Sequence, residues 1–352
     1  MDSESNNKLE KLIDFIKFRK STTGSYDLAK RTATFINDLI QGSDDNLNVQ
    51  ELIENITIIG RKLVKIDPTE TVVGNMIKRV LKLVRDEYNH IKGENDETQN
   101  AHESLEIIVT AASNEIEEFD PKIKIKLIKD PICIAINELL SELEISGGNI
   151  AQQALEHIYS DEVIMTIGSS KTVEAFLKYA SKNKRKFQTI IAECAPFYNG
   201  HDLALSLAND SINTILIPDS AIFSVMSRVN KVIIGAHSIM ANGGIKAVSG
   251  AYTLALAAKH YSVPFIVCTG MFKLTPQNMV NYDQLAFNKF SSPQDILKYE
   301  TDYSTKCQVI NPVFDYVPPE LVTIFVSNIG GNSPSHVYHL LNELYHQHDE
   351  LD

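Results

Sequence analysis

Apolar side chains recur every three or four residues through the first part of the chain. The stretches with this spacing are 9–16, 28–39 and 72–84. Such spacing places the apolar side chains on one face of a helix, so it predicts a helical N-terminal region. Pro68 and Thr69 are expected to precede the third helix. A further helix is expected to begin with Asp130 as its N-cap and Pro131 in its first turn.

From about residue 150 the pattern changes to short apolar runs that alternate with amphipathic stretches. The predicted strands are 163–167, 189–193, 214–217, 231–234, 265–268 and 321–326. The predicted helices between them are 171–182, 200–209, 220–228 and 249–260. Repeated strand–helix–strand units form a parallel sheet that helices cover on both faces. The chain is therefore predicted to be an α/β protein, with a helical N-terminal domain (1–145) followed by a Rossmann-like parallel α/β domain (146–352).

Charge and composition limit the classes of partner. The chain has 33 basic and 45 acidic residues, a formal net charge of −12, so attraction to nucleic acid or anionic lipid is not its general design. The basic side of the third helix, with Lys78, Arg79, Lys82 and Arg85, is then most simply a solvated surface. No apolar run approaches the roughly 20 residues of a membrane-spanning helix. We expect no membrane partner and no direct nucleic-acid partner.

The cysteines and the N-terminus indicate the compartment. Cys133, Cys194, Cys268 and Cys307 lie far apart with no C-x-x-C pair, which argues against a zinc knuckle or a disulfide framework. The first residues are acidic and polar, unlike a secretory signal. We expect a reducing compartment, the cytosol. The histidines near the C-terminus lack the cysteines or close carboxylates of a metal site, so no metal is expected there: His336, His339, His346 and His348.

Four polar or small residues lie at the carboxyl ends of predicted strands: Gly168, Glu193, Asp219 and His237. In parallel α/β sheets, ligands bind beyond the carboxyl ends of the strands. The same edge of the sheet should therefore carry these residues. It is the expected location of any binding site.

The segment after the first strand has two interpretations. Gly168, Ser169, Ser170 and Lys171 lie where a strand passes into a helix, so their N–H groups and hydroxyls suit a phosphate. The alternative is ordinary hydroxyl capping of the helix. The segment lacks the spacing of a Walker A loop, and no G-x-G-x-x-G follows a strand, so no nucleotide cofactor is expected.

Similar alternatives apply at the next strand ends. Glu193 and Asp219 suit proton transfer or sugar binding, or else simple capping. Cys194 is a candidate nucleophile, but a lone cysteine at a strand end is more often a buried apolar residue. Further on, Asn242 opens a glycine-rich turn, and Lys246 supplies a cation suited to phosphate.

Three other segments have partner or linker interpretations. The basic loop 182–186 suits an acidic or phosphorylated partner, or is a solvated turn. The polar stretch 93–100 is typical of a linker. The segment 314–345 is more hydrophobic than a free surface should be, so we expect it to meet a partner.

Several motifs together resemble one known superfamily. It joins the regulatory subunits of eukaryotic translation initiation factor 2B to methylthioribose-1-phosphate isomerase and ribose-1,5-bisphosphate isomerase. The motifs that carry the resemblance are Gly235-Ala236-His237, Asn242-Gly243-Gly244, Ala255-Leu256-Ala257-Ala258-Lys259 and Pro264-Phe265-Ile266-Val267. It is strong over about residues 160–345. The segments most similar to beta-type subunits are 71–76, 226–231, 271–274, 314–321 and 328–332.

The resemblance implies that catalysis has been lost. The isomerases use a Cys after the first α/β-domain strand and an Asp in a Gly-Ala-Asp turn. Gly168 stands in the place of the Cys, and His237 in the place of the Asp. Glycine cannot transfer a proton, and His237 would lack its partner. What remains is expected to be a residual isomerase-like pocket without catalytic residues.

The resemblance also implies partners. A regulatory subunit would assemble with the alpha, gamma, delta and epsilon subunits of the guanine-nucleotide exchange factor for initiation factor 2. It would help to bind the alpha subunit of that substrate and to sense its phosphorylation, while exchange itself lies in another subunit. The alternative is an aldose–ketose isomerase that acts on a ribose phosphate. The identities of Gly168 and His237 favour the regulatory subunit.

Overall fold

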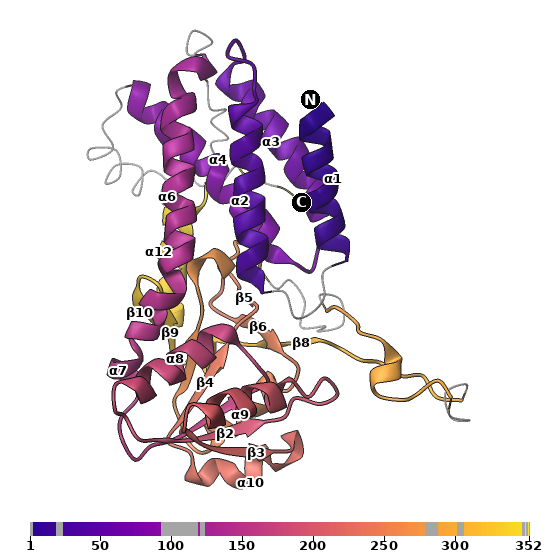
Figure 1. Ribbon diagram of the computed structural model, residues 1–352, viewed down its shortest axis with the longest axis vertical. Helices are drawn as coiled ribbons and strands as arrows, with labels where there is room; N and C mark the ends of the chain where they lie inside the picture. The colour runs from indigo at the N-terminus through magenta and orange to yellow at the C-terminus, as the bar shows by residue number, and fades with distance from the viewer. Residues whose placement is uncertain are drawn as a thin grey trace. The chain divides into compact units, whose positions relative to one another are not determined.

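A computed structural model describes residues 3–18, 24–92, 119, 124–278, 288–300, 306–346, 349 and 351. The chain forms two compact units (Figure 1). One comprises Met1–Glu142 together with Leu344–Asp352, and the other comprises Leu143–Glu343. These units differ from the predicted domains in two respects: the boundary lies between Glu142 and Leu143, and Leu344–Asp352 groups with the helical unit. The predicted linker 93–100 lies outside the described residues.

The helical unit is built from amphipathic helices. They are α1 (Ser3–Lys17), α2 (Ser25–Gln41), α3 (Val49–Val64), α4 (Thr71–Lys92) and the first part of α6 (Ile125–Gln152). The predicted stripes face its core: Leu12 and Ile16 on α1 and Leu28 and Ile36 on α2 are buried. The helical prediction for this region is confirmed.

The start of α6 was predicted incorrectly. The helix begins at Ile125, so Pro131 lies inside it and Asp130 is not its N-cap. Two long-range features fix the earlier start. The backbone N–H of Ile125 donates to Leu47 O at 3.1 Å, and the side chains of Ile125 and Ile128 are fully buried. Because this first turn is buried, the helix begins at Ile125, although Pro131 lies within it.

The polar side of α4 is not the solvated basic face that was expected. Arg85 is buried and forms an ion pair with Asp349, whose atoms Nη2 and Oδ1 lie 2.7 Å apart. Arg79 pairs with Glu142 at 3.6 Å. Arg85 therefore belongs to the interior of the helical unit, and only part of the predicted face is open to solvent.

The α/β unit contains a seven-stranded sheet in the order β10-β9-β7-β4-β1-β2-β3. Its strands are β1 (Val163–Ile167), β2 (Gln188–Ala192), β3 (Asn213–Ile217), β4 (Lys231–Gly235), β7 (Phe265–Cys268), β9 (Ile324–Ser327) and β10 (Gly330–Asn332). All neighbours are parallel except β9 and β10. The α/β fold class is confirmed.

Helices connect the strands as the alternating pattern predicts. The connecting helices are α8 (Lys171–Lys182), α9 (Asn199–Asn209), α10 (Ile222–Val225) and α11 (Ala251–His260), while α7 (Ala154–His157) precedes β1 and α12 (Val337–Leu344) follows β10. Phe176 of α8 and Leu203 of α9 share one core cluster with Ile164, Ile191 and Ile233 of the sheet. The predicted helix 220–228 is instead three short pieces, with 3-10 turns at Asp219–Ala221 and Met226–Arg228 on either side of α10.

A second, three-stranded antiparallel sheet was not predicted. It has the order β5-β6-β8, formed by β5 (Ser238–Ile239), β6 (Ile245–Val248) and β8 (Phe314–Val317). The glycine-rich segment after Asn242 is thus a hairpin turn followed by a strand. The apolar segment 314–345 is largely explained by internal packing, because Val317, Phe325 and Val326 are buried, so its hydrophobicity does not require a partner.

Candidate functional site

The strand order brings the predicted site residues to one edge of the large sheet. From β1 the chain moves through β2 to β3, and then returns to β4 on the other side of β1. This reversal makes a topological switch point between β1 and β4, the usual place for a ligand in such folds. Gly168 follows β1 and His237 follows β4, so both lie at this switch point.

Gly168 adopts a backbone conformation that suits glycine. Its φ is +62°, and its N–H donates to Ala192 O at 3.1 Å. A Cβ at this position would lie 3.5 Å from both Cβ and Sγ of Cys194. The thiol of Cys194 therefore lies beside Gly168, at ordinary contact distance from the position of a Cβ there.

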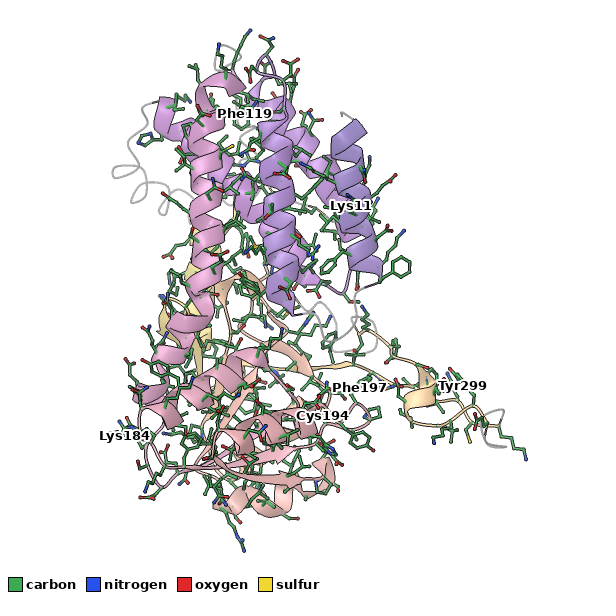
Figure 2. The ribbon with its side chains drawn as sticks, viewed as in Figure 1. Lys11, Phe119, Lys184, Cys194, Phe197 and Tyr299 are labelled. Atoms are coloured by element: carbon green, nitrogen blue, oxygen red, sulfur yellow. The ribbon has the colours of Figure 1, made fainter. Side chains whose placement is uncertain are left out.

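Cys194, which is labelled in Figure 2, is a buried thiol. Burial raises its pKa to about 12, with smaller contributions from the nearby carboxylates of Asp219 and Asp315. The thiol is therefore protonated at neutral pH, and a protonated thiol is a poor nucleophile. Of the two interpretations of Cys194, the geometry favours the buried apolar residue.

Asp219 holds the loop after the neighbouring strand. Its Oδ1 accepts the N–H of Cys194 at 2.9 Å, and its Oδ2 accepts the N–H of Ala195 at 2.7 Å. Both carboxylate oxygens are thus used to fix the backbone at the end of β2. Asp219 thus holds a loop 24 residues earlier in the chain, which neither interpretation of this residue predicted.

Ser170 does not cap α8 with its side chain. It precedes the helix in an extended conformation and makes no side-chain cap hydrogen bond. A Cβ on Gly235 would lie 2.5 Å from its hydroxyl oxygen, so β4 approaches this serine closely. Ser169 and Lys171 are exposed. The capping interpretation is therefore wrong for Ser170, and the phosphate interpretation stays a prediction.

Glu193 pairs with a histidine that the sequence did not single out. Its Oε2 lies 3.4 Å from Nε2 of His201 in the first turn of α9. The close approach of α9 is fixed by Gly200, where a Cβ would lie 2.6 Å from Ala192 O. The only local signal for His201 was its place eight residues after Glu193, at the start of a predicted helix.

His237 is packed against an aromatic ring. Its imidazole stacks on Phe314 with the ring centroids 4.4 Å apart, and its backbone N–H donates to Lys246 O at 2.8 Å. Nζ of Lys246 lies 4.7 Å from the centroid of the same Phe314 ring. The structure thus brings His237 and Lys246 together through Phe314.

Asn242 has a structural role in the hairpin between β5 and β6. Its Oδ1 accepts the N–H of Gly244 at 2.9 Å, and its Nδ2 donates to the hydroxyl of Tyr316 at 2.7 Å. A Cβ on Gly244 would overlap the Tyr316 ring. Asn242 therefore fixes the turn and joins it to β8.

Asp315 is a second residue, besides His201, that the sequence did not single out. Its Oδ2 accepts the N–H groups of Gly250 at 2.8 Å and Tyr252 at 3.2 Å, so it caps α11 from β8. It also contributes to the raised pKa of Cys194. The motif 314–321 contained this residue, but no local pattern connected it with a helix 63 residues earlier.

Metal binding and membrane spanning are two further possibilities for this chain. Among the described residues there is no group of three His, Cys, Asp or Glu side chains that could hold a metal. The rings of His336 and His339 lie 5.3 Å apart, and His348 is outside those residues. No described helix combines the length and apolar character needed to cross a bilayer.

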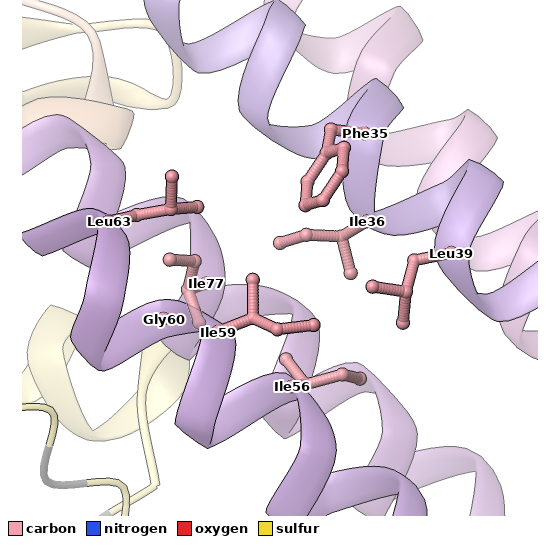
Figure 3. A pocket seen from close by; sticks show the side chains of 8 residues that line it. All are labelled: Phe35, Ile36, Leu39, Ile56, Ile59, Gly60, Leu63 and Ile77. Atoms are coloured by element: carbon pink, nitrogen blue, oxygen red, sulfur yellow. The ribbon is translucent and has the colours of Figure 1, made fainter. Parts of the chain in front are cut away.

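A hollow in the helical unit has a purely apolar lining (Figure 3). The lining residues come from α2, α3 and α4: Phe35, Ile36, Leu39, Ile56, Ile59, Gly60, Leu63 and Ile77. It offers no room for a water molecule. It is therefore a packing gap and not a ligand site.

The sequence is similar to those of known beta subunits of translation initiation factor eIF2B. The chain is 40% identical over 369 residues to translation initiation factor eIF2B subunit beta of Dictyostelium discoideum, covering 95% of this chain and 94% of the relative. It is 34% identical over 386 residues to the subunit of the same name in Schizosaccharomyces pombe, covering 97% and 96%.

The fold is also similar to those of solved eIF2B structures. The crystal structure of eIF2B beta from Chaetomium thermophilum has a TM-score of 0.74 at 26% identity and covers 98% of this chain and 94% of that one. A chain of the tetrameric eIF2B-beta2-delta2 complex from that organism has a TM-score of 0.72 at 25% identity, with 97% of this chain and 95% of that chain covered. The model of the initiation factor 2 subunit family matches residues 21–334. The family predicted from the motifs is confirmed: this chain belongs to the initiation factor 2 subunit family.

Proposed function

We propose that the chain is a non-catalytic regulatory subunit of the guanine-nucleotide exchange factor for initiation factor 2. Family membership supports a role in translation initiation, and the relatives named above are beta subunits of eIF2B. One solved complex with a similar chain is a tetramer of two beta and two delta subunits of eIF2B. In this proposal the chain scaffolds the complex and helps to bind the alpha subunit of the substrate and to sense its phosphorylation.

The observation that carries the non-catalytic part of the proposal is the pairing of Gly168 with Cys194. The place where the related isomerases need a catalytic Cys holds a glycine at φ +62°, and the adjacent thiol is buried and protonated. At the other catalytic position, the ring of His237 stacks on Phe314. Isomerisation needs an acid and a base on the same substrate, and these contacts supply no such pair.

The proposed partners are the alpha, gamma, delta and epsilon subunits of the exchange factor, and initiation factor 2 itself. The proposed location is the cytosol. Native mass spectrometry of the endogenously tagged protein tests this directly, with a set of different subunits expected to co-purify. The isolated chain is expected neither to bind GTP nor to accelerate nucleotide release, because it has no Walker A loop.

The competing function is a sugar-phosphate isomerase. Its test uses the purified chain with methylthioribose-1-phosphate and with ribose-1,5-bisphosphate. We expect no turnover of either. Turnover that the substitution His237→Ala abolishes, from a preparation without other subunits, would overturn the regulatory proposal.

A further inference from the structure

Two histidines lie side by side at the start of α12. His336 ends the 3-10 turn η6 (Pro334–His336), and His339 lies in the first turn of α12, which continues directly from it. Side chains three residues apart are neighbours on the surface of such turns. The two imidazole rings accordingly have centroids 5.3 Å apart, with 38° between their planes.

The separation of the rings fits a shared metal ion. Imidazole binds Zn²⁺ at a nitrogen–metal distance of about 2.0–2.1 Å, so two imidazoles on one ion have centroids roughly 4.5–6 Å apart. The observed 5.3 Å lies within this range. Metal-binding helix bundles use the same spacing of three residues in their Glu-x-x-His motifs. From the sequence we expected no metal here, because cysteines and close carboxylates are missing. The ring geometry adds a different possibility, a chelate made by the two imidazoles alone.

Both rings are accessible, and their backbone is fixed. His336 and His339 are exposed. Within the described part of the chain, neither ring makes a hydrogen bond or an ion pair, and their ring contacts are with each other and between His339 and Tyr338. Val337 and Leu340 are buried, so the helix that carries the histidines is held by the core of the α/β unit. The net charge of −12 favours the approach of a cation.

We propose that His336 and His339 together bind one divalent transition metal ion of the class that imidazole prefers, namely Zn²⁺, Ni²⁺ or Cu²⁺. Each neutral imidazole gives the lone pair of one ring nitrogen to the ion, and water fills the remaining coordination positions. The bound ion connects η6 to the first turn of α12. With two protein ligands the site is weaker than a structural zinc site, which has four. The inference goes beyond the proposed function and does not rest on it.

Isothermal titration calorimetry of the purified full chain with Zn²⁺ tests the proposal. The titrations use a Cys307→Ser background, because this exposed thiol would compete for zinc. The matched variant exchanges two exposed neighbours, Tyr338→His with His339→Tyr, which keeps the composition but places the histidines two residues apart, where they do not face each other. The dissociation constant should rise at least about tenfold, because the second ligand is lost, and His336→Asn should have the same effect. His260→Asn, at an exposed histidine of α11, should leave the site unchanged.

Chemical protection provides a second measurement that does not depend on a variant staying folded. Saturating Zn²⁺ should protect His336 and His339 of the wild type from diethylpyrocarbonate, as measured by peptide mass spectrometry, and should leave His260 reactive. Zinc binding that the exchange of Tyr338 and His339 leaves intact would mean an adventitious ion only and would overturn the proposal. A chain that takes up no Zn²⁺, or one in which the two histidines stay reactive, would overturn it as well. Neither measurement involves another subunit, so failure here leaves the proposed function untouched.

Discussion

Arg85 and Asp349 form a buried ion pair that ties the end of the chain to α4. Their side chains are 8% and 2% exposed, and Nη2 of Arg85 donates to Oδ1 of Asp349 at 2.7 Å. The guanidinium also lies 5.9 Å from the ring centroid of Phe119, which is labelled in Figure 2. The Phe119 ring in turn packs edge-on against Tyr88. Leu351 packs beside Gly60, so the last residues complete the core of the helical unit.

Removal of Asp349 should destabilise the protein strongly. Asp349→Ala leaves the Arg85 charge buried without this partner, and breaking a buried pair in this way costs about 3–5 kcal/mol. Urea unfolding followed by circular dichroism measures the change. Asp38→Ala is the control, because it removes the exposed pair with Lys8 and should cost about 1 kcal/mol or less. Equal effects of the two substitutions would show that the C-terminal contact contributes little.

Gly168 should tolerate alanine poorly. At φ +62° an L-residue is strained, so Gly168→Ala should lower the free energy of unfolding by about 1–2 kcal/mol. Gly148→Ala is the matched control in α6, where a Cβ would meet nothing within 4 Å. It should raise stability by about 0.5–1 kcal/mol, since alanine is the better helix former. The two glycine substitutions are thus expected to change the free energy of unfolding in opposite directions.

Gly200 should tolerate alanine poorly for a different reason. The added Cβ would lie 2.6 Å from Ala192 O and 2.9 Å from Cα of Glu193, and both are backbone atoms that cannot turn aside. Overpacking of this kind costs roughly 1–3 kcal/mol. Thermal unfolding of Gly200→Ala should show the loss. An unchanged melting temperature would mean that α9 can move away from β2 without cost.

The cysteines should differ in reactivity. Cys307 is exposed, whereas Cys133, Cys194 and Cys268 are buried. Brief treatment with iodoacetamide at neutral pH should modify Cys307 and leave Cys194 intact, because burial raises the pKa of Cys194 to about 12. Peptide mass spectrometry measures the modification, and the same treatment in urea, where all four thiols should react, is the control. Modification of native Cys194 at the rate of Cys307 would contradict its burial.

The Cys194 thiol makes the stability of the folded protein depend on pH. Its folded pKa is raised above the ordinary value of 9.0, so the folded state favours the protonated form. The resulting contribution is fully present below pH 9 and is lost as the pH rises from there toward the folded pKa of about 12. Unfolding free energies measured across the lower part of this range should fall less steeply in Cys194→Ala than in the wild type.

Local pattern was sufficient for most of the elements. The strands predicted at 163–167 and 265–268 and the helix at 171–182 have the observed bounds, because an apolar run or a three-to-four spacing reports the conformation of the residues that carry it. The same logic placed Gly168 and His237 at one edge of the sheet, since the ends of parallel strands share an edge. The motifs identified the family, which the comparisons confirm.

The tertiary structure decided the roles of the side chains at that edge. β6 is a strand because β8, 66 residues further on, pairs with it, and the same return of the chain lets Asp315 cap α11 and Phe314 stack on His237. Cys194 lies beside Gly168 because β1 and β2 are neighbouring strands. Arg85 is buried because the chain returns to α4 near its end and places Asp349 against it. Each of these contacts joins residues far apart in the chain. Their formation depends on where the chain returns in space, which a pattern of neighbouring residues does not encode.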